Sequence, residues 1–230
     1  MELRSRAFPI LGLGLSAVLM AWAIFAIAVG DGNRSNAEPL GIADAQQTFA
    51  GILQDGNQIG SNEAPVSISL FTDLQCPSCA DWFLETIPPL VASEVRNDDV
   101  ALQLRHFSVG PIPRSVSAIA ASAAGEQGDQ WQYAYILMAN IDQAPQQGID
   151  IDYLRDVAAS VPGQRFDPIE WADAYQSGRA EDIVDVDRAL SDSMRLTAES
   201  AVVVDGPGGS KQLEGSPSLE QIRAAIESVR

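Results

Sequence analysis

The chain has 230 residues, enough for one sizeable domain with additional elements, and its 46% hydrophobic and 20% charged residues are typical of a globular protein. Asp and Glu outnumber Lys and Arg by 31 to 14, and the net charge of −17 argues against nucleic acid as a partner. Only two cysteines are present, which excludes a scaffold of several disulfides and a four-cysteine zinc site within one chain. We therefore expect one domain with no bound cofactor or metal, in which the two cysteines act as a pair.

The N-terminal segment predicts a membrane anchor. Residues 8–29 carry no charge and are long enough, at about 1.5 Å per residue, to cross a hydrocarbon layer of about 30 Å. Arg4 and Arg6 precede this run, which predicts a single-pass protein of the cell membrane with a cytoplasmic N-terminus and a periplasmic or extracellular domain. A cleaved signal peptide is the alternative, because residues 26–28 fit a cleavage site, although the run exceeds the usual ~7–15 apolar residues. Either segment delivers the domain to an oxidising compartment, where cysteine pairs form disulfides.

The next segments predict a linker followed by a strand, a helix and a second strand. Residues 31–64 have the polar, glycine-rich composition of a tether, with one helical candidate at residues 43–53. Residues 66–71 alternate between apolar residues and serine before they end at Phe71, which predicts a strand. A helix from Pro77, bent at a later pair of prolines, and a strand over residues 100–107 complete a βαβ unit with parallel strands.

The rest of the chain predicts helices, then a hairpin and a last helix. Between residues 114 and 199 the patterns are helical, and we interpret the aromatic residues of this insertion as packing residues. These residues are Trp131, Tyr135, Tyr153, Trp171 and Tyr175. Residues 201–214 predict a hairpin with a glycine-rich turn, and Ser216 and Pro217 are expected to open the final helix.

The motif Cys76-Pro77-Ser78-Cys79 lies where the first predicted strand ends and the helix begins. The sulfur of Cys76 should face unpaired backbone N–H groups and the positive end of the helix dipole, both of which favour a thiolate. Cys79, one turn later, lies on the same side and can attack a mixed disulfide on Cys76. We interpret the pair as a nucleophile and its resolving cysteine; a static disulfide and half of a metal site are the alternatives.

Two polar residues near the motif are further candidates. His106, the one histidine of the chain, ends the second predicted strand, whose carboxyl end should lie near the active site. It either tunes the cysteines or is a packed histidine at the rim. Asp73, three residues before Cys76, either assists proton transfer or closes a turn through its own backbone.

The cysteine segment and its surroundings resemble the DsbA-like thiol-disulfide oxidoreductases of the thioredoxin superfamily, particularly membrane-tethered bacterial members. The resemblance covers about residues 60–229 and rests on Gly60-Ser61, Ala64-Pro65-Val66, the run from Leu70 to Cys79, the alanine-rich residues 115–125 and Trp131. It implies an α/β thioredoxin-like fold with a helical insertion, preceded by one transmembrane helix. It also implies exchange with protein thiols or disulfides and a membrane redox partner of the vitamin K epoxide reductase type. The expected organisation is an anchor at 1–30, a linker at 31–64 and a domain at 65–230 with its insertion at about 114–199.

One position departs from the resembled family, whose members carry a Thr-Pro pair with a cis proline beside the cysteines. Alignment puts Glu199-Ser200 there, and we expect residues 199–201 to lie against the cysteine pair. A cis bond costs about 2.5–4 kcal/mol without proline, so the peptide before Ser200 is expected to be trans. The missing proline favours an alternative function, a thioredoxin-fold accessory or structural subunit of a membrane complex with an idle disulfide. The presence of both cysteines and Pro77 favours exchange.

Overall fold

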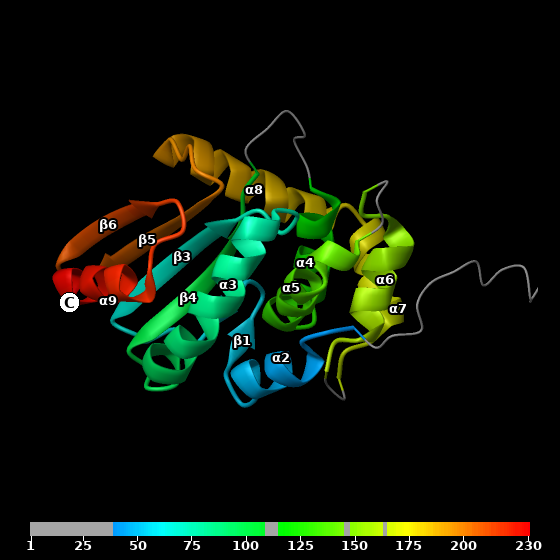
Figure 1. Cartoon of the computed structure of the whole chain (residues 1–230), viewed down its shortest axis with the longest axis horizontal. Helices are drawn as coiled ribbons and strands as arrows, with labels where there is room; N and C mark the ends of the chain where they lie inside the picture. The colour runs from blue at the N-terminus through cyan, green and yellow to red at the C-terminus, as the bar shows by residue number, and fades with distance from the viewer. Residues whose placement is uncertain (1–38, 109–114, 145–147, 163–164) are drawn as a thin grey trace, which may run out of the picture. The chain divides into compact units, whose positions relative to one another are not determined.

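The computed structural model describes residues 39–108, 115–144, 148–162 and 165–230 (Figure 1). The predicted anchor at residues 8–29 lies outside these residues. Within the part of the chain that the structure describes, no helix is long and apolar enough to cross a membrane.

The described residues form a mixed six-stranded sheet in the order β1-β2-β4-β3-β5-β6. Its strands are β1 (Gln54–Asp55), β2 (Gln58–Ile59), β3 (Val66–Thr72), β4 (Val100–His106), β5 (Ser200–Gly206) and β6 (Gly209–Glu214). Strand β3 is parallel to β4, with Thr72 opposite His106, and antiparallel to β5, with Thr72 opposite Ser200. The carboxyl end of β3 is therefore flanked by the end of β4 and the beginning of β5.

Helix α3 (Pro77–Leu90) connects the parallel strands and confirms the predicted βαβ unit. The pair Pro88-Pro89 does not end this helix, which continues to Leu90 and passes into a π-helical turn at Val91–Val95. Prolines lack a backbone N–H, and the wider π turn follows directly after the positions where the α-helical pattern loses these donors.

The segment predicted as a linker is, from residue 39 onward, part of the folded domain. Helix α2 (Ile42–Phe49) buries Phe49, whose ring centroid lies 6.0 Å from that of Trp131. Strand β2 pairs with β4, and Gly60 follows it with a φ of +95°, where a Cβ atom would lie only 3.0 Å from the backbone oxygen of Val100. The glycine-rich composition thus reflects tight turns between short elements rather than a tether.

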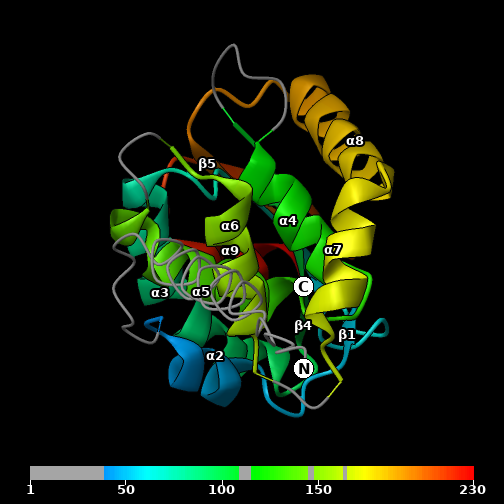
Figure 2. The ribbon, with the colours of Figure 1, turned by 90° about the vertical axis from the view of Figure 1, so that its right-hand side faces the viewer.

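Between residues 115 and 199, the described part of the predicted insertion consists of helices joined by turns and loops, without a strand (Figure 2). Its helices are α4 (Val116–Gly125), α5 (Gln130–Ala139), α6 (Ile151–Ala159), α7 (Pro168–Gln176) and α8 (Arg179–Met194), with a 3₁₀ turn at Ile141–Gln143. Trp131 and Trp171 are fully buried, and their rings stack on Phe83 and Tyr133, respectively. These contacts confirm that the large aromatic residues pack the core.

The two faces of the sheet are covered by different helices (Figure 1). The main core joins β3 and β5 to α3 and the last helix, α9 (Leu219–Val229). On the opposite face, Phe71 and Val203 form a smaller cluster with Leu190 and Met194 of α8. Helix α9 begins two residues later than predicted, because Ser218 rather than Ser216 caps it through a reciprocal pair of hydrogen bonds with Gln221.

Candidate active site

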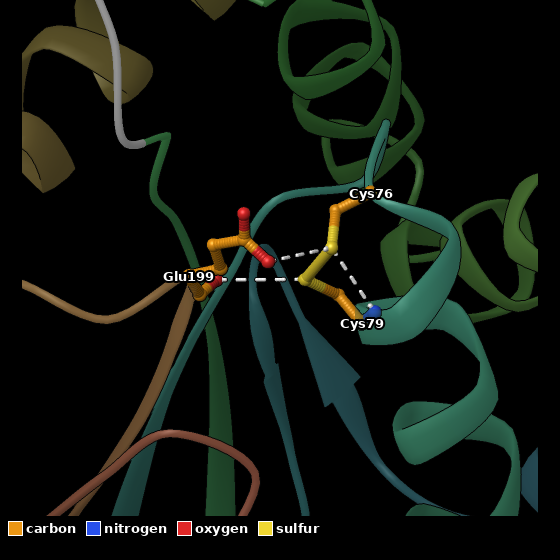
Figure 3. A group of neighbouring side chains, drawn as sticks. All are labelled: Cys76, Cys79 and Glu199. Atoms are coloured by element: carbon orange, nitrogen blue, oxygen red, sulfur yellow. Dashed lines mark hydrogen bonds between the residues drawn. A yellow bond between two sulfur atoms is a disulfide. The ribbon is translucent and has the colours of Figure 1, made fainter.

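The cysteine pair lies at the N-terminus of α3, directly after β3 (Figure 3). Cys76 is the residue that caps the helix, with an extended backbone (φ −94°, ψ 115°), and Pro77 opens the first turn. The backbone N–H of Cys79 donates a hydrogen bond of 3.1 Å to Sγ of Cys76, and Oγ of Ser78 lies 3.2 Å from the same sulfur. The predicted position of Cys76 at the strand-to-helix junction is confirmed.

Cys76 and Cys79 form a disulfide, with their Cα atoms 5.2 Å apart. The two sulfurs differ in access, because Cys79 is 1% exposed while Cys76 is only partly buried. A large substrate can approach Cys76 but not Cys79. This asymmetry agrees with the roles assigned to the two cysteines from the sequence.

Glu199 approaches both sulfurs from the segment before β5 (Figure 3). Its Oε2 atom lies 3.5 Å from Sγ of Cys76, and its backbone oxygen lies 3.7 Å from Sγ of Cys79. The disulfide carries no S–H, so the two oxygens can accept hydrogen bonds from the sulfurs only after reduction. The carboxylate then disfavours a thiolate on Cys76, whereas the Cys79 N–H favours it.

Ser200, which the sequence assigned to the site, turns away from this contact. It is buried at the start of β5, and its hydroxyl lies 3.5 Å from the hydroxyl of Thr72 on the neighbouring strand. All peptide bonds among the described residues are trans, as expected here without proline. The predicted segment does reach the cysteines, but through Glu199, whose carboxylate the sequence analysis did not include among the site residues.

A hydrogen-bonded carboxylate on β6 holds the segment that carries Glu199. Oε2 of Glu214 accepts hydrogen bonds from the backbone N–H groups of Thr197 and Ala198, at 3.2 and 3.3 Å, and from the Thr197 hydroxyl at 3.1 Å. These bonds, first of all the one from the Thr197 backbone, lower the pKa of Glu214. The position of Glu199 therefore depends on the edge strand as well as on β5.

Asp73 closes the turn between β3 and the cysteines. Its Oδ1 atom accepts a hydrogen bond of 2.8 Å from the backbone N–H of Gln75, and its backbone oxygen accepts one from Cys76 at 3.3 Å. This is the turn role considered from the sequence. It orients the backbone of Cys76 directly.

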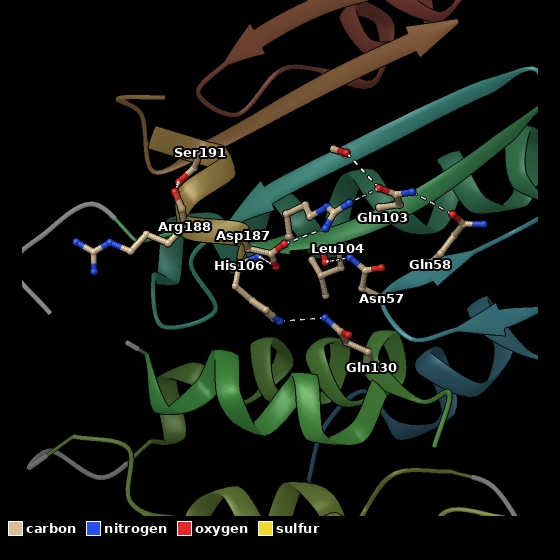
Figure 4. Close-up of polar contacts among 11 residues, drawn as sticks. Asn57, Gln58, Gln103, Leu104, His106, Gln130, Asp187, Arg188 and Ser191 are labelled. Atoms are coloured by element: carbon tan, nitrogen blue, oxygen red, sulfur yellow. Dashed lines mark hydrogen bonds and ion pairs between the residues drawn. The ribbon is translucent and has the colours of Figure 1, made fainter. Parts of the chain in front are cut away.

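His106 is buried in a polar network away from the sulfurs (Figure 4). Its Nε2 atom lies 3.0 Å from the amide nitrogen of Gln130, and its backbone N–H donates to Oδ2 of Asp187 at 2.9 Å. Burial lowers the pKa of His106 from 6.5 to about 4, against the opposing effect of the Asp187 carboxylate. His106 lines a cavity of about 220 Å³ together with Thr72 and Asp73, but neither cysteine lines that cavity.

Asp187 of α8, fully buried, is the centre of this network. Its Oδ1 atom accepts a hydrogen bond of 3.0 Å from Nη1 of Arg105, whose side chain is 22% exposed. The two carboxylate oxygens of Asp187 thus bind two consecutive residues of β4, Arg105 and His106, and join α8 to that strand. This pairing could not be predicted from the sequence, because Asp187 lies in a helix with many other acidic residues.

The same site contains a group of potential metal ligands. Sγ of Cys76, Sγ of Cys79 and a carboxylate oxygen of Glu199 all lie within 4.8 Å of one another. Among the described residues, no other group of three or more His, Cys, Asp or Glu side chains brings its ligand atoms this close together.

Comparison with known proteins supports the architecture. A family model described as Thioredoxin matches residues 54–228. No curated protein matches the chain by sequence. Among solved structures, alpha-DsbA1 from Wolbachia pipientis is similar, with a TM-score of 0.63 and 15% identity over 78% of this chain and 91% of that chain. Oxidised BdbD from Bacillus subtilis gives a TM-score of 0.61 at 18% identity over 76% and 96% of the two chains. DsbA from Chlamydia trachomatis gives 0.60 at 19% identity over 76% and 91%. These likenesses confirm the α/β thioredoxin-like fold with a helical insertion.

Proposed function

Because the chain belongs to the thioredoxin family, we propose that it is a thiol-disulfide oxidoreductase that acts on protein thiols or disulfides through Cys76 and Cys79. The placement of the disulfide carries this proposal. One sulfur caps α3 and can be approached from outside, and the other is buried one turn into the helix. A purely structural disulfide requires no such difference in access.

The greater exposure of Cys76 supports it as the sulfur that reacts first with substrate. A substrate thiolate attacks Sγ of Cys76, the Cys76–Cys79 bond breaks, and Cys79 leaves with the electron pair. A second substrate thiolate then attacks the substrate sulfur of the mixed disulfide and releases Cys76. The substrate gains a disulfide and the protein pair gains two electrons. The steps run in reverse when the substrate has the higher reduction potential.

The surroundings of each sulfur support this division of roles. The Cys79 N–H donates to Cys76 and stabilises the negative charge that Cys76 carries when it leaves or attacks. The backbone oxygen of Glu199 is placed to accept a hydrogen bond from Cys79 once Cys79 takes up a proton. Reduction can therefore leave Cys79 protonated and Cys76 available as the nucleophile.

We also propose that residues 8–29 anchor the domain outside the cytoplasm, where a membrane partner of the vitamin K epoxide reductase type resets the pair. The uncharged run after Arg4 and Arg6 supports the anchor, and a disulfide is the form that an oxidising compartment maintains. Fusion of alkaline phosphatase, which is active only outside the cytoplasm, to the C-terminus is expected to give activity in the membrane fraction. A mature N-terminus at Val29 would instead show that the segment is a cleaved signal peptide.

A second candidate function is that of a thioredoxin-fold accessory or structural subunit of a membrane complex. The trans backbone at Ser200 favours it, because the resembled family uses a cis proline at this position to present its backbone to substrate. Under this alternative the disulfide is stable and does not exchange.

Trapping and redox titration distinguish the two functions. In the proposed oxidoreductase, the Cys76 thiolate of Cys79→Ser attacks a disulfide of an oxidised model substrate, and one substrate sulfur leaves as a thiolate. The mixed disulfide accumulates because no resolving cysteine remains. Cys76→Ser is the matched control and is not expected to form it, because it keeps only the buried Cys79. Titration of the full-length chain against glutathione is expected to give a reduction potential above about −300 mV. A lower potential, with no trapped species from either variant, would assign a structural disulfide.

A further inference from the structure

The reduced site brings together three groups that bind metals. The sulfurs of Cys76 and Cys79 and the carboxylate of Glu199 supply ligand atoms within 4.8 Å of one another. Figure 3 shows the Glu199 carboxylate turned toward Cys76, with the cysteines converging on the same side. Two cysteines alone supply too few ligands for a closed zinc site, but the fold adds Glu199 from 120 residues further along the chain.

The distances fit tetrahedral coordination of Zn²⁺. With Zn–S bonds of about 2.3 Å and a Zn–O bond of about 2.0 Å, tetrahedral geometry separates sulfur and oxygen by about 3.5 Å. The structure places Oε2 of Glu199 3.5 Å from Sγ of Cys76. Two thiolates on one zinc ion lie about 3.8 Å apart, which Cys-X-X-Cys pairs at the start of a helix reach in zinc proteins. The disulfide must open for the sulfurs to separate this far.

The charges of the reduced site also favour a cation. Opening the disulfide produces two ionisable thiols beside a carboxylate, and no basic side chain pairs with Glu199 among the residues that the structure describes. Either protons or a metal ion must compensate these charges. The Cys79 N–H that donates to Cys76 stabilises the deprotonated sulfur, which is the form that binds a metal.

We propose that the reduced cysteine pair and Glu199 form a binding site for Zn²⁺ that the disulfide abolishes. This proposal rests on the proposed function in one respect, since both require that the Cys76–Cys79 disulfide can be reduced. Binding displaces the thiol protons to solvent and forms two Zn–S bonds and one Zn–O bond, with water at the fourth position on the exposed side of Cys76 and Glu199. No electrons are transferred. Oxidation of the pair to the disulfide releases the ion.

Zn²⁺ titration of the full-length chain, purified in mild detergent, tests this site. The chain is reduced with a phosphine, the reductant is removed, and free thiols are counted before competition against a chromophoric zinc indicator. The reduced chain is expected to take one Zn²⁺ from the indicator and the oxidised chain none. Glu199→Gln is expected to weaken binding by at least about tenfold, as removal of a ligand should cost no less than removal of an outer-shell partner. Binding strengthens with pH, since protons leave the thiols.

The matched control is Glu85→Gln, which makes the same change on the exposed face of α3 and should leave the affinity unchanged. As a second measurement, Co²⁺ bound to the wild-type reduced chain should show sulfur-to-cobalt charge-transfer absorption. Two free thiols without Zn²⁺ uptake would overturn the site alone, and an unchanged affinity in a folded Glu199→Gln variant would remove Glu199 from it. A disulfide that resists reduction would overturn both the site and the proposed function.

Discussion

Glu199 places a negative charge beside the sulfur that must react. Its carboxylate oxygen and the Cys79 N–H are both close to Sγ of Cys76, at 3.5 and 3.1 Å, and they act in opposite directions. The N–H stabilises a thiolate, while the carboxylate repels it and favours the thiol. The reactivity of Cys76 is therefore the balance of two neighbours that come from distant parts of the chain.

Glu199→Gln is expected to raise the thiolate fraction of Cys76 and so its rate of alkylation. Two charges a few ångströms apart interact by about 1 kcal/mol in water, which corresponds to a several-fold faster reaction below neutral pH. The rate of iodoacetamide labelling of Cys76 in the reduced protein, measured from pH 5 to 8, checks this. Slower labelling, or a rate equal to that of wild type at every pH, would contradict the repulsion.

His106 should make the fold sensitive to mild acid. Its pKa is about 4 in the folded protein and 6.5 ordinarily, so the unfolded chain binds the proton more strongly. The resulting stabilisation is fully present above about pH 6.5 and is lost as the pH falls to about 4. The shift corresponds to about 3 kcal/mol of unfolding free energy.

Urea unfolding at pH 7 and pH 4 measures this loss. Carboxylates titrate in the same range, so the comparison is with His106→Gln, which keeps a polar side chain without the ionisation. The variant is expected to lose about 3 kcal/mol less than wild type between the two pH values. Equal losses in both proteins would mean that His106 is not the group responsible.

For single residues, the sequence predicts the roles that depend on residues nearby in the chain. Cys76 as the cap of α3 follows from the preceding strand and from Pro77, and the turn at Asp73 follows from its own side chain. The roles of Glu199 and His106 could not be predicted in this way. They depend on whether a side chain at a strand end turns toward the cysteines or into the interior, which the packing of α8 and β6 decides.

At the scale of elements, α8 is held to the sheet by one buried carboxylate. Asp187 accepts hydrogen bonds from the Arg105 side chain and from the His106 backbone, so both of its oxygens are used on β4 (Figure 4). Apolar contacts of Leu190 and Met194 with Phe71 continue the same interface toward the end of the helix. Helix α8 also leads directly to the segment that carries Glu199.

Asp187→Ala is expected to lower the unfolding free energy by about 3 kcal/mol, because it leaves a buried N–H and a guanidinium without their acceptor. The value lies at the low end for a broken buried pair, since Arg105 is partly exposed. Asp192→Ala, at an exposed position of the same helix, is the matched control and should change stability little. Chemical denaturation of both variants checks the difference. Similar stability for the two variants would show that the apolar contacts alone hold α8.

The elements themselves were predictable where their patterns are local. The alternating strand before the cysteines, the helix after them and the glycine-rich hairpin turn all appear in the structure as predicted. Strands β1 and β2 could not be predicted, because each has two residues and neither carries a periodic pattern. They are strands because β4 offers an open edge, which is a property of the folded sheet.

At the scale of the whole molecule, the domain begins before the predicted boundary at residue 65. Phe49 and Ile59 are fully buried, and Nε1 of Trp131 donates to the backbone oxygen of Asn57 at 2.9 Å. The segment before residue 65 therefore completes the core on the side of the helical insertion. It is a structural part of the domain.

A fragment of residues 39–230 is expected to unfold cooperatively, whereas a fragment of residues 65–230 should lose most of its stability. Removing two buried apolar side chains, each worth about 1.5–3 kcal/mol, is a large change in a domain whose total stability is about 5–15 kcal/mol. Thermal unfolding followed by circular dichroism compares the two. A shorter fragment that melts at the same temperature as the longer one would restore the boundary at residue 65.

The contact between Glu199 and Cys76 links the folding of the chain to the redox state of the cysteine pair. The two residues are 123 positions apart, so in the unfolded chain the sulfur has neither this carboxylate nor the capping N–H beside it. Any difference between the reduction potentials of the folded and unfolded chain must equal the difference in unfolding free energy between the oxidised and reduced forms, at about 1.4 kcal/mol for each 30 mV. If the reduced form is the more stable, folding makes the pair a stronger electron acceptor. If the oxidised form is the more stable, folding makes the reduced pair a stronger electron donor. Two denaturation curves, one with and one without reductant, therefore show whether folding shifts the pair toward accepting or toward donating electrons.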